Sequence, residues 1–442
     1  MPLVGSIPSC PGVPGGRRPA GVTARTYRVE LITPMFGGGV KAGEPDEKMP
    51  VRGTTIRGQL EFWWRATVGA ACRSPEELRS KQEKVWGSTE RASRVGIALR
   101  VKGLEAEPCA SYVWSPQARR GQGGWKLQWR PWANPVKYAL FPFQGSAPPP
   151  RRNAKSADPP RKCIRTLSFE LTVEAPDKLW EELRSALQAW ALFGGLGART
   201  RRGCGAIRVT GLNEGTFVPK DRSALEQAIK DCCRPRSVRP WPTLAKAVLR
   251  GPEFGSATDA WGRAIQLLEK FRQRPDVGRN PGQRGRPGRS RWPEPETIRG
   301  LTGRRDRNHH RLDYMPTDAT PRAELGLPIV FHFKDRRDPP DVFLQPTDHE
   351  RMASPLILRP VALANGKYVP IVCVLNTEPL SGVEFVEVEH RRPLRPRAPL
   401  RVRGADLCEY RNSPLRYDRT KSGSAVEAFL GYAERNGFQR IV

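Results

Sequence analysis

The chain has 442 residues, of which 38% are hydrophobic, and this length and composition suit two folded domains with long polar insertions. Lys and Arg together number 75 against 45 acidic residues, a net charge of +30 that predicts a polyanionic partner, above all nucleic acid. No apolar run approaches the roughly 18–20 residues of a membrane span, and the nine cysteines form no CxxC pair, which argues against a membrane protein and a zinc ribbon.

The pattern of the first half of the sequence predicts one compact domain. Residues 1–23 are rich in Gly and Pro and are expected to form a loose leader. In residues 24–215, hydrophobic periodicity predicts strand, helix, strands, strand, helix and strand, the order of a ferredoxin-like fold with insertions. The predicted strands are Thr26–Ile32, Val95–Val101, Ala110–Trp114, Thr166–Val173 and Ala206–Val209. The first predicted helix starts at Thr54 or Thr55, and the second spans Asp177–Phe193. A basic, Pro-rich loop is expected at Gly145–Lys162.

The second half, residues 216–442, is less regular. Its central feature is the Arg-rich stretch 272–312, which we expect to be a loop or linker that only RNA or a partner would order. The predicted strands are Leu244–Arg250, Leu327–Phe333, Pro355–Leu358 and Tyr368–Leu375, and the predicted helices are Ala260–Phe271 and Ala425–Asn436.

A glycine-rich segment at residues 194–205 is the main candidate site. Its glycines allow positive φ and close approach of a ligand, and turns of this kind can present backbone N–H groups to phosphate. It follows a helix and has no GK[ST] ending, so it is neither a dinucleotide fingerprint nor a Walker A loop. The alternative is an ordinary helix-to-strand connection with solvated arginines. We expect the turn to be exposed and to bind RNA through Gly195, Gly197, Arg199, Arg201, Arg202 and Gly203.

Other segments add candidate RNA contacts. Arg52 and Arg57 flank the first predicted helix, whose N-terminus favours phosphate, whereas Arg65 could equally pair with Glu61. Trp63 and Trp64 have the spacing of core residues. Further candidates are Phe36, which could stack on a base from a glycine-flanked loop tip, Arg291 and Trp292, of which the second could instead be a packing anchor, and Arg351 and Arg359, which could line a groove or only flank a strand.

Three stretches carry a family resemblance. GGLGARTRRGCG at 194–205 resembles the glycine-rich loop of the RAMP superfamily, the repeat-associated proteins of CRISPR systems. ITPMFGGG at 32–39 and VRGTTIRGQLEFWWR at 51–65 resemble the amino-terminal signature of the first RAMP subunit of the type III-B (Cmr) effector complex. RWPE at 291–294, ELGLPIVFHFK at 324–334 and RMASPLILRP at 351–360 resemble its carboxy-terminal half.

The resemblance implies an α+β protein of two ferredoxin-like (RRM-like) domains without a nuclease centre, in which slicing belongs to another RAMP subunit. It implies a place at the end of a helical complex that holds the 3′ part of the guide RNA and the opposing target. The partners would be guide RNA, target RNA and other RAMP subunits. Its motifs add Gly38, Arg299 and Lys334 to the candidate RNA contacts. An odd number of cysteines without a signal peptide predicts a cytoplasmic protein that is not attached to a membrane.

The histidines and acids give little support for catalysis. His332 is expected to be a satisfied histidine inside an apolar strand, and His309 and His310 lie in the predicted linker. A metal-dependent nuclease would need converging carboxylates, and Asp46, in a loop beside Glu44 and Glu47, is the one acid that such a loop could present to a scissile phosphate. We therefore expect no metal and no cofactor. Three hypotheses remain: an RNA-binding subunit, a RAMP endoribonuclease that cuts precursor guide RNA, and a protein–protein adaptor.

Overall fold

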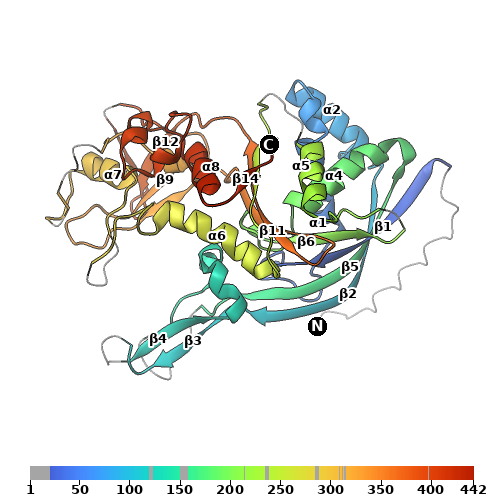
Figure 1. The fold of residues 1–442 in the computed structure, drawn as a ribbon, viewed down its shortest axis with the longest axis horizontal. Coiled ribbons are helices and arrows are strands. Elements are labelled where there is room, and N and C mark those ends of the chain that lie inside the picture. Colours follow the sequence, from blue (N-terminus) through green and yellow to red (C-terminus); the bar gives the residue numbers. More distant parts are fainter. Residues whose placement is uncertain are drawn as a thin grey trace, which may run out of the picture.

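The computed structural model shows a mixed α/β protein with antiparallel sheets (Figure 1). It describes residues 20–118, 123–149, 158–213, 215–233, 238–283, 288–307, 309–310, 312, 315–396 and 398–442. Most of the predicted leader and residues 150–157 of the predicted basic loop lie outside these ranges. Val22 and Thr23, which were assigned to the leader, belong to the first strand. Within the described ranges, no helix combines the length and apolarity needed to cross a bilayer.

The first domain is built on a four-stranded antiparallel sheet. The strand order is β2-β5-β1-β6, which reads 2-3-1-4 when the strands are numbered along the domain. Burial alternates along β5, so that Phe169, Leu171 and Val173 face the core beneath the helices. The predicted order of strands and helices is therefore confirmed here. The elements are β1 (Val22–Leu31), α1 (Gly53–Ala66), β2 (Gly96–Pro108), β5 (Lys162–Pro176), α4 (Trp180–Phe193) and β6 (Ile207–Gly211).

The second domain repeats this arrangement. Its sheet has the order β10-β11-β7-β14, which is again 2-3-1-4, and one helix follows its first strand while another precedes its last. The elements are β7 (Thr243–Arg250), α6 (Ala257–Gln273), β10 (Leu356–Ala362), β11 (Tyr368–Asn376), α8 (Ala425–Arg435) and β14 (Gln439–Arg440).

An insertion between α6 and β10, completed by the segment after β11, forms a third sheet with a core of its own around Ile298 and Phe385. The prediction of a structureless linker over residues 272–312 is wrong, because helix α7 (Glu294–Thr302) lies within it. Glu296 on α7 forms ion pairs with Arg289, Arg299 and Arg305. These contacts hold the helix and neutralise part of the charge of the Arg-rich stretch. The strands are β8 (Ile329–Phe331), β9 (Val342–Pro346), β12 (Val383–Glu387) and β13 (Pro393–Leu394).

The first domain carries an insertion between its second and third strands. A two-stranded hairpin projects from the body, and the teal segment that follows it in Figure 1 packs against α6 of the second domain. The elements are β3 (Ala110–Ser115), β4 (Gly124–Trp129), the 3-10 helix Pro131–Val136, α3 (Lys137–Leu140) and the 3-10 helix Phe141–Phe143. The remaining helices of the domain are α2 (Pro75–Trp86) and α5 (Arg222–Cys232).

Candidate nucleic-acid interface

The glycine-rich loop, residues 194–205, lies between the two domains. Arg359 on β10 is fully buried and donates to the carbonyl oxygens of Gly194 and, at 3.0 Å, of Ile207. In the other direction, Arg202 Nη1 donates to Leu356 O at 2.8 Å. Trp261 on α6 donates from Nε1 to Arg202 O at 2.7 Å. The loop is therefore held against the second domain by charge-assisted and neutral hydrogen bonds.

This location corrects the expectation that the whole turn is exposed. Arg201 and Arg202 are half-buried and donate to carbonyl oxygens of the second domain, Arg201 to Ser354 O. Gly195 and Gly203 are buried. A methyl group on Gly203 would lie 2.5 Å from Trp261 Nε1, so glycine is required there by packing against a neighbouring domain.

Arg199 differs from its neighbours because it is exposed. It adopts the left-handed conformation with φ of +58°, which is uncommon for a residue with a side chain. Its side chain lines a cavity of about 460 Å³ between the first-domain insertion and α6. Of the three loop arginines, Arg199 is thus the one positioned to meet a ligand.

The loop arginines form part of a cluster that lacks described counter-ions. Burial, followed by the charges of Arg272 and Arg199, lowers the pKa of Arg202 to about 9. Although the surface of Arg199 is exposed, the protein around its guanidinium partly removes water from it, and this desolvation, followed by the charge of Arg272, also lowers the pKa of Arg199. Among the described residues, no carboxylate forms an ion pair with Arg199, Arg201, Arg202 or Arg272. Because the positive charges of these side chains oppose one another, an anion bound here would relieve the repulsion.

A second cavity, of about 260 Å³, also borders the loop, and its lining includes Gly38, Arg52 and Gly197. It lies at the N-terminal end of α1, which has no side-chain cap and no acidic residue in its first turn. Such an end attracts anions. A methyl group on Gly197 would overlap the Phe36 carbonyl, so this glycine also serves close packing. The structure therefore brings together Gly38, Arg52 and Gly197, three of the residues that the sequence analysis proposed as RNA contacts.

Two of the first-domain candidates have structural roles instead. Phe36 is not at an exposed tip but fully buried, with its ring stacked on Phe143 at 4.2 Å between centroids. Arg57 donates to Ser93 Oγ at 2.5 Å and Val95 O at 2.8 Å, which ties α1 to the start of β2. Trp63 and Trp64 lie in the core, so that prediction is confirmed.

The second-domain candidates divide into buried and exposed residues. Arg299 is buried in ion pairs with Glu296 and Asp338, and Arg359 is buried in the interdomain clamp, so neither is free to bind RNA. The alternative of Trp292 as a packing anchor is confirmed, because it is buried and donates from Nε1 to Arg272 O at 3.0 Å. Half-buried Arg291 donates to Asn280 Oδ1 at 2.8 Å.

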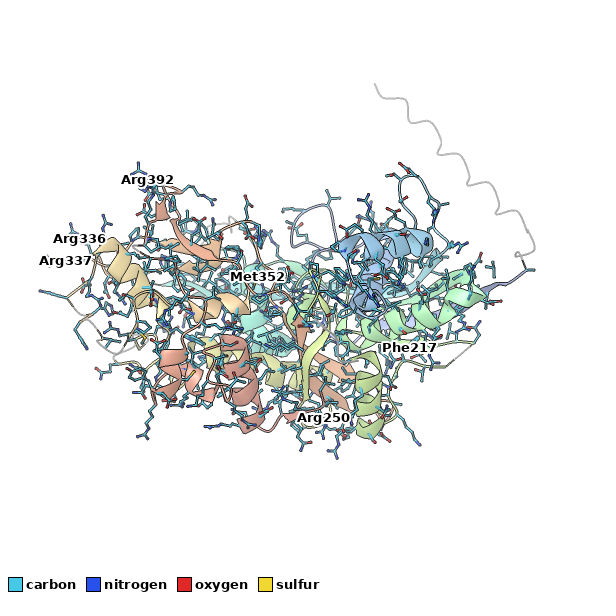
Figure 2. The ribbon with its side chains drawn as sticks, turned by 90° about the horizontal axis from the view of Figure 1, so that it is seen from above. Phe217, Arg250, Arg336, Arg337, Met352 and Arg392 are labelled. Atoms are coloured by element: carbon cyan, nitrogen blue, oxygen red, sulfur yellow. The ribbon has the colours of Figure 1, made fainter. Side chains whose placement is uncertain are left out.

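Exposed basic residues also lie away from the loop. Lys334 and Arg351 are exposed. Figure 2 shows Arg336, Arg337 and Arg392 at the outer end of the insertion, while Met352, next to Arg351 in the chain, lies near the middle of the molecule. Neither Lys334 nor Arg351 lines either of the two cavities.

The candidate acid and histidine are already engaged. Asp46 Oδ1 accepts from the backbone N–H groups of Lys48 and Met49 at 3.0 Å, and Oδ2 accepts from Arg52. These contacts, led by the Met49 N–H, lower the pKa of Asp46 and favour its charged form. His332 is exposed beyond the end of β8, with Nδ1 2.6 Å from Asp341 Oδ2, so the expectation of a histidine inside the strand is wrong.

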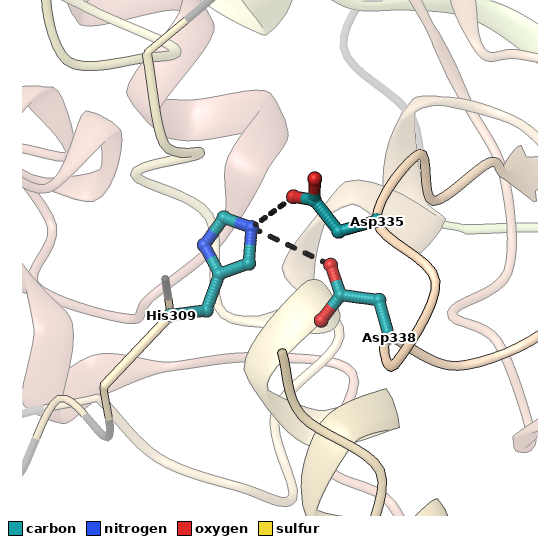
Figure 3. Close-up of side chains that lie close together, drawn as sticks. All are labelled: His309, Asp335 and Asp338. Atoms are coloured by element: carbon teal, nitrogen blue, oxygen red, sulfur yellow. Dashed lines mark hydrogen bonds and ion pairs between the residues drawn. The ribbon is translucent and has the colours of Figure 1, made fainter. Parts of the chain in front are cut away.

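A cluster of His309, Asp335 and Asp338 lies at the end of the insertion (Figure 3). His309 Nε2 is 3.0 Å from Asp335 Oδ2 and 3.4 Å from Asp338 Oδ2. Both Asp338 oxygens already accept from Arg299 at 3.0 Å, and a guanidinium there opposes a bound cation. We therefore interpret the cluster as an ion network that holds α7 against the sheet.

Sequence reasoning did not single out the aromatic residues of the larger cavity, namely Trp129, Tyr138 and Phe141, or the cation Arg272. The available signal was the stretch WKLQWRPWANPVKYALFPF at 125–143, in which aromatic and basic residues alternate. Such interleaving is typical of surfaces that bind single-stranded nucleic acid.

Comparisons with known proteins agree with the sequence resemblance. Residues 28–208 match the model of the RAMP superfamily. The CRISPR system Cmr subunit Cmr1-2 of Pyrococcus furiosus is 26% identical over 200 residues, which are 42% of this chain and 96% of that protein. The crystal structure of apo Cmr1 from Pyrococcus furiosus aligns with a TM-score of 0.47 and 14% identity over 95% of this chain and 98% of that one.

A chain of the Type III-B Cmr-beta complex bound to cognate target RNA aligns with a TM-score of 0.45 and 10% identity, over 81% of this chain and 96% of that one. Residues 28–208 are thus similar to the RAMP superfamily, in agreement with the resemblance of the glycine-rich loop. Over 200 residues its sequence is also similar to a Cmr subunit, in agreement with the resemblance of the amino-terminal signature.

Proposed function

We propose that this chain is a non-catalytic, RNA-binding subunit of a type III-B CRISPR (Cmr) effector complex in the cytoplasm, active in antiviral defence. Its two ferredoxin-like domains, residues 24–215 and 216–442, would hold guide and target RNA near the 3′ part of the guide and contact other RAMP subunits. The observation that carries the proposal is the exposed guanidinium of Arg199, which lines a cavity and with which no described carboxylate forms an ion pair. Phosphates are the anions that such forks bind best.

Arg199 gives the direct test because it is exposed and its loss should not unfold the protein. Arg199→Ala should weaken binding of single-stranded guide RNA several-fold and reduce the slope of log affinity against log salt by about 0.7, the value for one lost phosphate contact. The matched control is Arg79→Ala, since that side chain is 83% exposed and pairs only locally with Glu83 on α2. Equal affinities for the two variants would contradict a contact at Arg199.

Salt dependence separates RNA binding from a protein–protein adaptor. About five phosphate contacts predict a loss of roughly a hundredfold in affinity between about 50 and 200 mM salt. An affinity that does not change with salt would favour the adaptor.

The endoribonuclease alternative is tested with precursor guide RNA, with and without divalent metal. We expect no site-specific cleavage, because Asp46 and His332 are held by Arg52 and Asp341 respectively. Cleavage that disappears in Asp46→Ala or His332→Ala would overturn the non-catalytic proposal.

The position in the complex has a separate test. A reconstituted complex that lacks this chain should lose nuclease protection over the 3′ part of the guide RNA and keep it elsewhere. Unchanged 3′ protection would refute the proposed place at that end.

A further inference from the structure

We propose that the 460 Å³ cavity beside Arg199 binds the base of one unpaired nucleotide of single-stranded RNA, with its phosphate on Arg199. This inference rests on the proposed function and specifies one contact within it. The volume lies within the range of about 300–1,000 Å³ that is typical of small-ligand sites, and such sites favour domain boundaries. This cavity lies at one, since its walls come from the first-domain insertion and from α6.

The aromatic side chains supply the reason for a base. Phe141 is 65% exposed at the edge of the cavity, whereas most phenylalanines of the described chain are buried. Tyr138 and Trp129 are half-buried and line the same space. Every base has a π-face, so aromatic walls bind unstacked bases of any sequence.

The polar lining supplies the reason for a nucleotide rather than an apolar ligand. Lys137 and Arg199 place two cations at the cavity, and Gln144 and Gln273 add amide groups that can bond to base edges. The lining also includes one carboxylate, Glu269, which pairs with Arg274 at 2.7 Å. Its negative charge is thereby neutralised and does not oppose a phosphate.

The backbone at Arg199 supports a positioned contact. The residue occupies the left-handed region at φ +58°, ψ +31°, and its carbonyl accepts from Arg202 N at 2.8 Å in the turn that follows. The turn fixes the direction of the Cα–Cβ bond of Arg199, so the side chain leaves the backbone at a set point in the cavity wall.

The experiment uses the full chain and a short fluorescein-labelled single-stranded RNA, with affinity measured by anisotropy over a range of salt. Phe141→Ala and Tyr138→Ala should each weaken binding by about fivefold to thirtyfold, as expected for the loss of one stacked base. Their salt slopes should equal that of the unmodified protein, because stacking releases no counter-ions, whereas Arg199→Ala should lower the slope.

Matched variants separate stacking from folding. Tyr138→Phe keeps the ring and should retain affinity. Tyr410→Ala removes a tyrosine that is 40% exposed and lies outside the cavity, and it should leave the RNA affinity and its salt slope unchanged. Melting curves confirm that the variants fold. RNA carrying 4-thiouridine should crosslink to peptides that contain residues 137–142.

The outcomes are distinguishable. If the unmodified protein binds RNA but Phe141→Ala and Tyr138→Ala bind equally well and crosslinks fall elsewhere, the base site is refuted and the proposed function stands. If no form binds RNA, both fail. Adenosine monophosphate is the second probe, and its binding is measured by the change in Trp fluorescence. Saturable binding that is lost in Phe141→Ala and that blocks the RNA would assign the cavity to a free nucleotide and overturn the RNA assignment.

Discussion

Substitution of Gly203 tests whether the glycine-rich loop couples the two domains. In Gly203→Ala the new methyl group would lie 2.5 Å from Trp261 Nε1 and 2.7 Å from Leu358 O. Neither neighbour can yield easily, because Trp261 is fully buried and hydrogen-bonded and Leu358 lies in the middle of β10. The residue also has φ of +78°, which is unfavourable for alanine.

The magnitude follows from a comparison with Gly366, which has the same φ of +78° but nothing within 4 Å of a new methyl group. Gly366→Ala should therefore lose only the backbone term, about 1–2 kcal/mol. Gly203→Ala should lose that amount and a further 1–3 kcal/mol, roughly, from overpacking. The difference between the two variants isolates the contact with Trp261 and Leu358.

Urea unfolding followed by circular dichroism measures both variants at the same protein concentration. We expect Gly203→Ala to have the lower midpoint and to separate into two transitions, since domains that are no longer coupled unfold independently. Equal midpoints for Gly203→Ala and Gly366→Ala would refute the close packing of the loop against the second domain.

Three further outcomes follow from buried groups. Trp292→Ala should cost about 3–5 kcal/mol of stability and leave the RNA affinity of the folded protein unchanged, as unfolding and binding titrations would show. Burial raises the pKa of both Glu296 and Asp338, but arginine hydrogen bonds outweigh it and leave each pKa lowered, so their stabilisation is present above about pH 4 and lost below it. Urea midpoints should therefore fall as the solution is acidified, and less so in Asp338→Asn. Burial raises the pKa of Cys204 to about 12, so mass spectrometry should find this thiol unmodified by iodoacetamide in the folded protein at pH 8.

Local patterns were sufficient to predict most of the strands and long helices. In β5 the buried residues alternate, and in α1 Ile56, Leu60 and Trp63 recur on one face, so periodicity reports burial directly. Helix α7 could not be found in this way. It is stabilised by Asp338, which is 39 residues from Arg299 in the chain, and a local window counts only the arginines.

The glycine-rich loop shows why a site is harder to predict than a fold. Its glycines correctly indicated that something approaches the backbone closely, but the sequence does not say whether that neighbour is a ligand or another domain. At Gly203 the neighbour is Trp261 of the second domain. Gly197 instead borders the smaller cavity and Arg199 the larger one. Arginine is equally ambiguous, because its five donors satisfy backbone carbonyl oxygens as well as phosphates.

Because one loop joins the domains and presents Arg199, docking of the domains should set RNA affinity. Arg202 N donates to Arg199 O, and Trp261 Nε1 on α6 donates to Arg202 O. Two hydrogen bonds therefore connect α6 to the backbone of Arg199, which carries the exposed guanidinium. Gly203→Ala displaces Trp261 without removing a charge. It should therefore weaken RNA binding while the salt slope stays that of the unmodified protein. A reduced slope would mean that the phosphate contact itself is lost, and unchanged affinity would mean that Arg199 is positioned by the first domain alone.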